Sequence, residues 1–385
     1  MSRKLTFIPG PIEFSKNVLA AMSTPSQAHT SPEFVKVFQS VLLKTRKMFA
    51  SKVESGSQPF VLAGSGTLGW DLCGANFVNK SDNVLVLSTG FFSDSFANCL
   101  KIYSDKVDVL EAPQFGAAID NSQLESMLSK TKYDVITITQ TDTSSGVLSN
   151  VEEISKIIKK SNPDAFIIVD AVCATACEAL EFDSWGIDYV LTASQKAVGV
   201  PAGLSISIAS ARAIKKAEAR ESPSAFFTDM KRWLPIMRAY EAGKGAYFAT
   251  PPVQLIHALN ASFDEILSKV DQSVDARVQA HVVASDYFKD KCVNELGLKL
   301  VPVSKDVAAH GLSVIYYPEN ITAGDLLSKM AENGFTIAGG IYKDYKDKYF
   351  RVGHMGVSAV GERKEELQQC FEALKLSLSQ LGYSK

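Results

Sequence analysis

The sequence lacks long hydrophobic runs: no apolar stretch approaches the roughly 18 residues that a membrane-spanning helix needs. We also expect no targeting segment, because Pro9 and Pro11 follow Arg3 and Lys4 too soon for a signal peptide or an amphipathic transit helix. Residues 382–385 contain Ser-Lys but not the leucine that completes a peroxisomal address. We therefore expect a cytoplasmic protein without a membrane span, and leave a peroxisomal or mitochondrial location open.

An excess of charge of one sign is absent as well, since 40 lysines and arginines oppose 42 aspartates and glutamates, a net charge of −2. No basic stripe with interleaved aromatic residues is present, so we expect no nucleic-acid partner. Cysteines are few, and their spacing gives no reason to expect a metal: Cys73, Cys99, Cys173, Cys177, Cys292 and Cys370. We interpret the pair Cys173 and Cys177, four residues apart, as core packing, and the compartment as reducing.

Internal repeats and low-complexity linkers are absent too, and 385 residues suffice for two or three domains with a sizeable core. Between residues 32 and 210, short apolar runs alternate with amphipathic stretches, which predicts an α/β fold with a mostly parallel sheet covered by helices on both faces. The predicted strands are 60–63, 83–88, 107–111, 135–139, 166–169, 189–191 and 204–209. The predicted helices are 32–49, with Ser31 as its N-cap, 67–78, 93–103, 121–129 and 151–160.

The rest of the chain does not show this regular alternation of apolar runs and amphipathic stretches. Residues 222–252 are rich in aromatics, glycine and proline, and we expect an extended segment without regular structure there. A long helical pattern follows over 253–294. The last ninety or so residues predict a smaller α+β domain, with strands over 312–317, 335–338 and 350–352 and helices over 323–333 and 363–381.

Two polar residues follow neighbouring apolar runs in a way that suggests chemistry. Asp170 comes directly after the strand 166–169, and Lys196 follows the strand 189–191. Both would lie at the carboxyl ends of strands, where open α/β sheets bind ligands. A lysine and a carboxylate placed this way suit pyridoxal phosphate, because the amine forms a Schiff base with its aldehyde and the acid keeps its pyridine nitrogen protonated. Taken alone, the pair is weak evidence, because a lysine and an aspartate after two strands are usually surface charges.

A glycine-rich turn, Gly64-Ser65-Gly66-Thr67-Leu68-Gly69, follows a predicted strand and opens a helix. Backbone N–H groups at a helix N-terminus bind anions, so the turn suits a phosphate. The same letters match the dinucleotide fingerprint, but that motif expects an acid at the end of the next strand. Here the next strand ends at Ser88, and the first acidic residue after it is Asp94, inside the following helix. A purely structural glycine turn is the third reading.

In this order and spacing, Ser65-Gly66-Thr67, Asp170 and Lys196 resemble the fold-type-I pyridoxal-phosphate enzymes, specifically the class V aminotransferases. Within them the chain resembles the alanine–glyoxylate and serine–pyruvate aminotransferase group, above all its fungal members. The resemblance covers nearly the whole chain and rests on these segments: 9–11, 28–32, 62–67, 144–147, 169–172, 194–197, 240–252 and 351–353.

The resemblance implies a large domain with a mostly parallel seven-stranded sheet between helices, and a smaller C-terminal α+β domain. The implied boundaries are an N-terminal segment over 1–20 that reaches the active site and the dimer interface, a cofactor-binding domain over 21–255 and a small domain over 256–385. It also implies pyridoxal 5′-phosphate as cofactor and an obligate homodimer with shared active sites.

The resemblance further assigns roles to single residues. Lys196 carries the cofactor as a Schiff base and moves the proton at the substrate Cα, and Asp170 pairs with the pyridine nitrogen. The residues that hold the rest of the cofactor are Ser65, Gly66, Thr67 and Gln195 at the phosphate, Ser144 near the ring hydroxyl, Val172 and Phe92 on the ring faces, and Tyr247 and Thr250 from the neighbouring subunit. Arg351 binds the substrate carboxylate, and Gly10 lines a small pocket.

Two positions depart from the group's pattern. Many relatives carry tryptophan where this chain has Phe92, and Phe91 next to it is an alternative for the stacking ring. Many also carry glycine before the histidine at Ala28-His29. We assign no role to His354, which we expect to be a hydrogen-bonded structural residue, and we expect Trp70, Trp185 and Trp233 to serve packing.

The implied reaction transfers the amino group of L-alanine to glyoxylate, giving pyruvate and glycine in a ping-pong sequence, with serine as the alternative donor. A cysteine desulfurase would need a nucleophilic cysteine on a mobile loop, whereas Cys292 and Cys370 both lie in helical patterns. A phosphoserine aminotransferase would need further basic residues in the pocket, and we find none. An NAD-dependent dehydrogenase is disfavoured by the missing acid after the glycine-rich turn.

Overall fold

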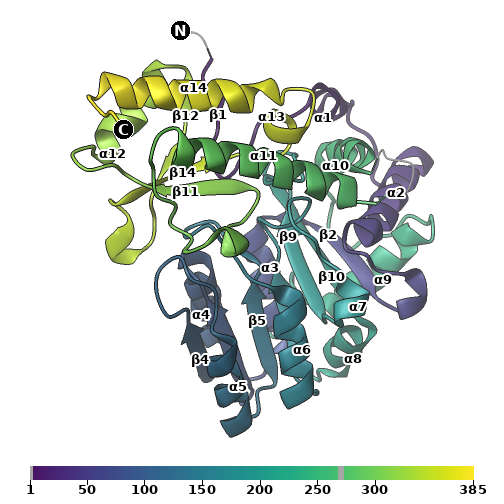
Figure 1. Cartoon of the computed structure of the whole chain (residues 1–385). Helices are drawn as coiled ribbons and strands as arrows, with labels where there is room; N and C mark the ends of the chain where they lie inside the picture. The colour runs from purple at the N-terminus through teal and green to yellow at the C-terminus, as the bar shows by residue number, and fades with distance from the viewer. Residues whose placement is uncertain (1–2, 268–272) are drawn as a thin grey trace.

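A seven-stranded sheet forms the centre of the chain in the computed structural model, which describes residues 3–267 and 273–385 (Figure 1). Its strands lie in the order β2 (Gln58–Gly64), β10 (Gly203–Ala209), β9 (Tyr189–Ala193), β8 (Phe166–Asp170), β5 (Val135–Thr139), β3 (Asn83–Ser88) and β4 (Lys106–Glu111). All neighbours pair in parallel except β10, which is antiparallel to both β2 and β9. The predicted mostly parallel α/β fold is therefore confirmed.

Helices cover both faces of this sheet, because the crossovers run in opposite directions along it. On one face lie α3 (Gly66–Phe77), α4 (Phe91–Tyr103) and α8 (Ala211–Ala219), and on the other α5 (Asn121–Lys130), α6 (Val151–Ser161) and α7 (Phe182–Trp185). The edge beyond β2 packs against α2 (Pro32–Met48), whose predicted N-cap Ser31 accepts a hydrogen bond from the Phe34 amide at 3.3 Å.

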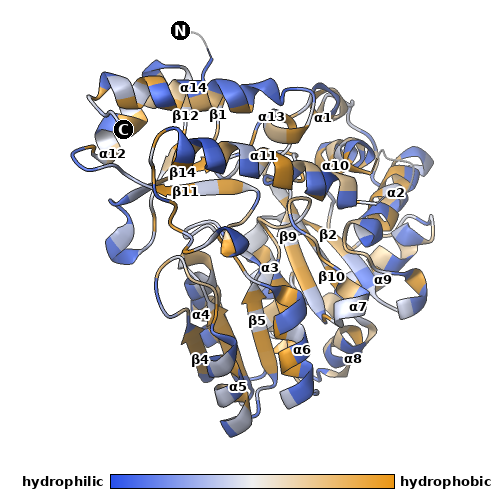
Figure 2. Cartoon of the chain, in the orientation of Figure 1, coloured by the Kyte–Doolittle hydropathy of each residue, from blue (hydrophilic) through white to orange (hydrophobic). Residues whose placement is uncertain are grey.

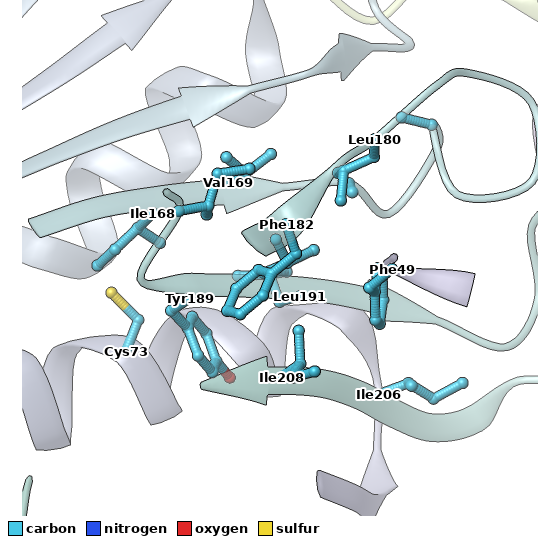
Figure 3. Packing of buried hydrophobic residues seen from close by; sticks show 14 of the residues in the cluster. Phe49, Cys73, Ile168, Val169, Leu180, Phe182, Tyr189, Leu191, Ile206 and Ile208 are labelled. Atoms are coloured by element: carbon cyan, nitrogen blue, oxygen red, sulfur yellow. The ribbon is translucent and has the colours of Figure 1, made fainter. Parts of the chain in front are cut away.

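The main hydrophobic core lies between the sheet and these helices. The strands are coloured mostly as hydrophobic, whereas the helices show one apolar and one polar side (Figure 2). Phe182 and Phe49 pack beside Leu191 and Ile208 of the central strands, and Tyr189 lies near Cys73 of α3 (Figure 3). Strands covered on both faces read as continuous apolar runs, which is why the sequence predicted them well.

The C-terminal part contains a second, smaller sheet and core. Its strands lie in the order β11 (Leu312–Tyr316), β14 (Tyr349–Gly353) and β13 (Ala338–Gly339), and its helices are α11 (Asp275–Asn294), α12 (Ala323–Glu332), α13 (Val357–Val360) and α14 (Glu365–Gln380). A separate cluster that includes Phe288, Phe350 and Phe371 fills this part. The boundaries 1–20, 21–255 and 256–385 stay predictions.

The N-terminal segment joins the two parts. Strand β1 (Leu5–Thr6) pairs in parallel with β12 (Phe335–Thr336), and the Gly353 amide donates to the Phe7 carbonyl at 2.7 Å. Farther along, the Ile12 amide donates to the Gln195 carbonyl at 3.2 Å, before α1 (Lys16–Met22) begins. The segment thus runs from the small sheet to the loop that carries Lys196. Two short strands, β6 (Thr141–Asp142) and β7 (Val147–Leu148), pair with each other in antiparallel orientation. The described residues also form three 3-10 helical turns, η1 (Val53–Ser55), η2 (Lys305–Val307) and η3 (Lys343–Tyr345).

One prediction about regular structure is wrong: residues 222–252 are not irregular throughout, because they contain helix α9 (Met230–Glu241). Its buried residues Met230, Trp233, Met237 and Tyr240 recur at helical spacing, and Asp229 caps it by accepting from the Lys231 amide at 3.0 Å. The aromatic, glycine and proline content hid this periodicity.

The predicted long helix over 253–294 is also wrong as a single element. Helix α10 (Val253–Ile266) ends at Leu267, and α11 begins at Asp275. The part of the prediction that falls on residues 268–272 lies outside the described residues. Within 3–267 and 273–385, no helix combines the length and apolarity needed to cross a membrane.

Candidate active site

The two residues singled out by their place after strands lie at the same edge of the sheet. Strands β8 and β9 are parallel neighbours, and Asp170, the last residue of β8, pairs with Leu191 of β9. Lys196 follows three residues after the end of β9. The parallel pairing therefore delivers the carboxylate and the amine to one site, as the sequence predicted.

Asp170 is a buried carboxylate, 4% exposed, with a hydrogen-bond donor on each oxygen. The Val172 amide donates to Oδ1 at 2.9 Å and the Trp70 indole Nε1 donates to Oδ2 at 2.7 Å. Burial raises the pKa of Asp170 to about 6; the two donors and nearby Lys196 oppose this shift, whereas Asp142 adds to it. The site thus holds a carboxylate that a cationic partner would stabilise.

Trp70 is the first residue whose role the sequence did not reveal. We expected it to serve packing, and it does stack on Phe96 with 5.3 Å between ring centroids. It also orients Asp170 through its indole N–H. No local signal marks this contact, because the partners are a hundred residues apart and meet only through the packing of α3 on the sheet.

Lys196 is half-buried and lies against the N-terminal segment. Its Nζ donates to the Pro9 carbonyl. Gly10 lies beside the lysine side chain with φ +91°, and a Cβ there would come within 2.5 Å of Lys196 Cδ. Only glycine fits this position, because both its backbone angle and the space exclude a side chain. The structure therefore brings Gly10 to Lys196, and the role of Gly10 in lining the substrate pocket stays a prediction.

The glycine-rich turn between β2 and α3 faces the same site. Gly66 is buried, and a Cβ on it would lie 2.9 Å from Val172 Cγ2 and 3.3 Å from the Ala193 side chain. Ser65, the N-cap of α3, makes no side-chain capping bond, and both Ser65 and Thr67 are exposed. Free hydroxyls at the N-terminus of a helix are suited to an anion.

Gln195 lies in the loop after β9, directly before Lys196. Its side-chain Oε1 is buried and finds no hydrogen-bond partner among the described residues. A buried acceptor of this kind needs a donor to offset its desolvation.

Phe92 and Ser144 are held together by a second buried carboxylate, Asp142, which the sequence did not reveal. The Phe92 amide donates to Asp142 Oδ2 at 3.0 Å, and the Ser144 hydroxyl donates to Oδ1 at 2.6 Å. Helix α4 begins at Phe91, two residues earlier than predicted, so Phe92 lies in its first turn. Phe91 is 43% exposed, whereas Phe92 is half-buried and packs against the main core.

Arg351 reaches the large domain from strand β14. It is 8% exposed, and its Nε donates to the Gly339 carbonyl at 2.8 Å and its Nη1 to the Thr143 carbonyl at 3.5 Å. Burial lowers its pKa. No carboxylate forms an ion pair with it within the described residues. A buried guanidinium held only by carbonyls is suited to bind a carboxylate.

Two predicted residues are not brought to this group within the chain. Tyr247 is 62% exposed and packs on His29, with 5.1 Å between the rings, and Thr250 is exposed as well. Both are accessible to a second subunit, which is what their predicted role requires.

The remaining candidates have structural environments. His354 is fully buried, and its Nε2 lies 2.9 Å from the Ser313 hydroxyl, as a structural histidine would. Cys292 and Cys370 are buried, and burial raises the pKa of both thiols, which makes them poor nucleophiles.

Comparison with known proteins defines the class. The family model for class-V aminotransferases matches residues 17–339, and this chain belongs to that family. Enzymes of this class depend on pyridoxal phosphate. The seven-stranded sheet and the smaller C-terminal sheet are those of the fold-type-I enzymes.

Two relatives and one solved structure show how similar this chain is to individual aminotransferases. Alanine–glyoxylate aminotransferase 1 of Saccharomyces cerevisiae is 47% identical over 380 residues, which cover 96% of this chain and 97% of that protein. Serine–glyoxylate aminotransferase of Arabidopsis thaliana is 26% identical, over 98% of this chain and 90% of that protein. Among solved structures, alanine–glyoxylate aminotransferase from Nostoc sp. superposes with a TM-score of 0.88 at 23% identity, covering 98% and 96% of the two chains.

The residues of the site fit this cofactor. Asp170 is a desolvated carboxylate whose charged form a cation, such as a protonated pyridine nitrogen, would stabilise. The exposed hydroxyls of Ser65 and Thr67 offer hydrogen-bond donors at a helix N-terminus. Lys196 supplies an amine at the same edge of the sheet. The aldehyde, the pyridine nitrogen and the phosphate of pyridoxal phosphate therefore each have a chemically suitable group in the chain.

Proposed function

We propose that this protein transfers the amino group of L-alanine to glyoxylate, giving pyruvate and glycine. The observation that carries the proposal is the 47% identity, over nearly the full length of both chains, to an alanine–glyoxylate aminotransferase. The grouping of Lys196, Asp170 and Arg351 at one edge of the sheet supports it.

Lys196 and Asp170 carry the chemistry in this proposal. When bound, pyridoxal phosphate supplies an aldehyde that condenses with amines and a protonated ring that accepts the electron pair of the Cα–H bond. Asp170 holds the proton on the ring nitrogen, since its burial makes a cationic partner favourable. Lys196 Nζ would remove the proton from the substrate Cα and deliver it to the carbon two bonds away, on the cofactor side of the transferred nitrogen.

The other residues bind and orient. Ser65, Gly66, Thr67 and Gln195 hold the phosphate, with hydroxyl, backbone N–H and amide N–H groups as the donors. Val172 and Phe92 pack on the two ring faces, and Ser144 contacts the ring hydroxyl. These assignments follow the family resemblance and are consistent with the positions of the residues.

Substrate recognition falls to Arg351 and Gly10. Arg351 binds the carboxylate that alanine, glyoxylate, pyruvate and glycine share, which lets one site serve both halves of a ping-pong cycle. Gly10 brings backbone rather than a side chain next to Lys196, which leaves space only for a small substituent on the substrate. Serine is the alternative donor, because a serine–glyoxylate aminotransferase is among the similar proteins.

A matrix of donors and acceptors tests the proposal. We expect kcat/KM to be highest for alanine with glyoxylate, lower for serine with glyoxylate, and lower still for aspartate with glyoxylate. The three donors share the carboxylate and differ only in the side chain that must fit beside Gly10. Higher kcat/KM with branched or aromatic donors than with alanine would refute the assignment, and higher kcat/KM with serine would move it to the alternative.

We also propose that the active unit is a homodimer with shared sites, because Tyr247 and Thr250 are exposed within one chain. Complementation tests this. A Lys196→Ala chain supplies an intact Tyr247, and a Tyr247→Ala, Thr250→Val chain supplies an intact Lys196. Each is expected to have little activity alone, and randomly mixed dimers to recover about a quarter of wild-type activity. Mixtures that show no more activity than their components would contradict sharing.

A further inference from the structure

Asp142 is a fully buried carboxylate that the proposed reaction does not use. It ends the short strand β6, and no lysine, arginine or histidine forms an ion pair with it within residues 3–267 and 273–385. Its charge is instead stabilised by hydrogen bonds and by the N-terminal end of α4, where negative charge is favourable. A buried charge kept without a counter-ion is costly, so its position calls for an explanation.

The hydrogen bonds of Asp142 reach two separate segments, one on each oxygen. Oδ2 accepts from the Phe92 amide at 3.0 Å and from the Ser93 amide at 3.1 Å, in the first turn of α4. Oδ1 accepts from the Ser144 amide at 3.0 Å and from the Ser144 hydroxyl at 2.6 Å. One carboxylate therefore fixes both Phe92 and Ser144, two of the residues assigned to the cofactor ring.

The same contacts decide the direction of the hydrogen bonds that Ser144 can make. A serine hydroxyl has one proton and two lone pairs. The proton of Ser144 is directed to Asp142 at 2.6 Å, and one lone pair accepts from the Phe91 amide at 2.8 Å. One acceptor position is left, so Ser144 can accept a hydrogen bond from a ligand but cannot donate one.

Gly90 makes this close arrangement possible. A Cβ on Gly90 would come within 2.3 Å of Ser144 Oγ and 2.7 Å of Asp142 Oδ1. Its φ of 168° is an extended conformation that any residue adopts, so the requirement for glycine is one of space alone. Any side chain there would push Ser144 and Asp142 out of their positions.

We propose that Asp142 is a positioning residue for the cofactor: it sets Ser144 as a pure hydrogen-bond acceptor and fixes Phe92 in the first turn of α4 before the cofactor binds. This inference rests on the proposed cofactor site. Arranging both groups in advance lowers the entropy lost on binding, so Asp142 contributes to affinity without touching the cofactor.

The test measures the dissociation constant of pyridoxal phosphate for the apoprotein by equilibrium dialysis. We expect Asp142→Asn to weaken binding about tenfold, because the NH2 group of the amide replaces one of the two acceptor oxygens and faces either the Phe92 and Ser93 amides or the Ser144 donors. Combining it with Phe92→Ala and with Ser144→Ala gives two double-mutant cycles. We expect each double variant to bind clearly more tightly than the product of the single effects predicts.

Asp120→Asn is the matched control. Asp120 also accepts a helix-terminal amide (Ser122, 2.8 Å) and the Ser122 hydroxyl (2.6 Å), but at the exposed N-terminus of α5. We expect its cofactor dissociation constant to equal that of the wild type. Gly90→Ala is the second variant: it keeps every hydrogen-bonding atom and displaces Asp142 and Ser144 by contact alone. We expect it to weaken binding and to be non-additive with Ser144→Ala.

The outcomes distinguish a failure of the proposed function from a failure of the role assigned to Asp142. If the wild-type apoprotein fails to bind pyridoxal phosphate, the proposed function is wrong. If the wild type binds and Asp142→Asn binds equally well, or if both cycles are additive, Asp142 is only a helix cap and this inference is overturned. Should Asp142→Asn not fold, the Gly90→Ala cycle decides in the same way.

Discussion

Asp170 depends on a side chain that is far away in the sequence. Its Oδ2 receives the Trp70 indole N–H at 2.7 Å, and its Oδ1 the Val172 amide at 2.9 Å. A hydrogen bond to a charged group contributes about 1.5–3 kcal/mol. Loss of the indole donor would therefore raise the pKa of Asp170 further and favour the shared proton on Asp170 rather than on the ring nitrogen of the cofactor.

We expect Trp70→Phe to lower kcat for alanine about tenfold or more while leaving KM for alanine little changed. The phenyl ring keeps the stacking on Phe96, so the variant isolates the hydrogen bond. Steady-state kinetics measures this, with Trp185→Phe in α7 as the control. A Trp70→Phe enzyme with the kcat of the wild type would show that the indole serves packing only.

Arg351 gives a second prediction for a single residue. Arg351→Ala is expected to raise KM for both alanine and glyoxylate about a hundredfold, since a buried bidentate cation is lost, while the absorbance of the bound cofactor stays intact. Arg351→Lys is expected to recover only part of the loss. The exposed Arg238, paired with Glu218, provides the control Arg238→Ala. A change confined to one of the two substrates would remove Arg351 from the shared carboxylate site.

How well single residues could be predicted depends on how local their signals are. Lys196, Asp170 and the turn at Ser65 to Thr67 stand directly after strands, so sequence order identifies them. Trp70 and Asp142 carry no such signal, because their partners lie 100 and about 50 residues away. Only the packed structure shows that these two side chains belong to the site.

Among elements, the best predictions concern strands and helices whose patterns are unbroken. The buried strands β3, β5 and β8 were placed nearly to the residue, and α2 was predicted with its N-cap. Helix α9 was missed because the aromatic, glycine and proline content of residues 222–252 suggested an extended segment, although its buried face has helical spacing. Tertiary packing overrides the local signal there.

Helix α11 leads to a prediction about pH. His281 of this helix is fully buried in neutral form: its Nε2 accepts from the Gly356 amide at 3.0 Å and its Nδ1 lies 2.9 Å from the Arg277 carbonyl. Burial lowers its pKa from 6.5 to about 3. Because the folded pKa lies below the unfolded one, the stability it contributes is complete above pH 6.5 and is lost as the pH falls toward 3.

Chemical denaturation of wild type and His281→Gln between pH 7 and 4 tests this. We expect the difference in free energy of unfolding between the two proteins to shrink by up to about 1.4 kcal/mol per pH unit below pH 6.5. A difference that stays constant over this range would mean that His281 titrates normally in the folded protein.

For the whole molecule, the N-terminal segment ties the two parts together at the active site. It pairs with β12 of the small part through β1, and then places Pro9 and Gly10 against Lys196. Arg351 reaches back from β14 to the Thr143 carbonyl. The site therefore exists only where the large sheet, the small sheet and the N-terminus meet, which no single segment of the sequence could show.

The central claim is that Lys196 and its neighbours form an amino-transfer site for alanine and glyoxylate. The most direct test mixes the cofactor-loaded protein with alanine alone and follows its absorbance at about 420 and 330 nm, the approximate bands of the two cofactor forms. The account predicts loss of the first band and growth of the second, reversed by glyoxylate but not by 2-oxoglutarate. No change with alanine, or reversal by 2-oxoglutarate alone, would contradict it.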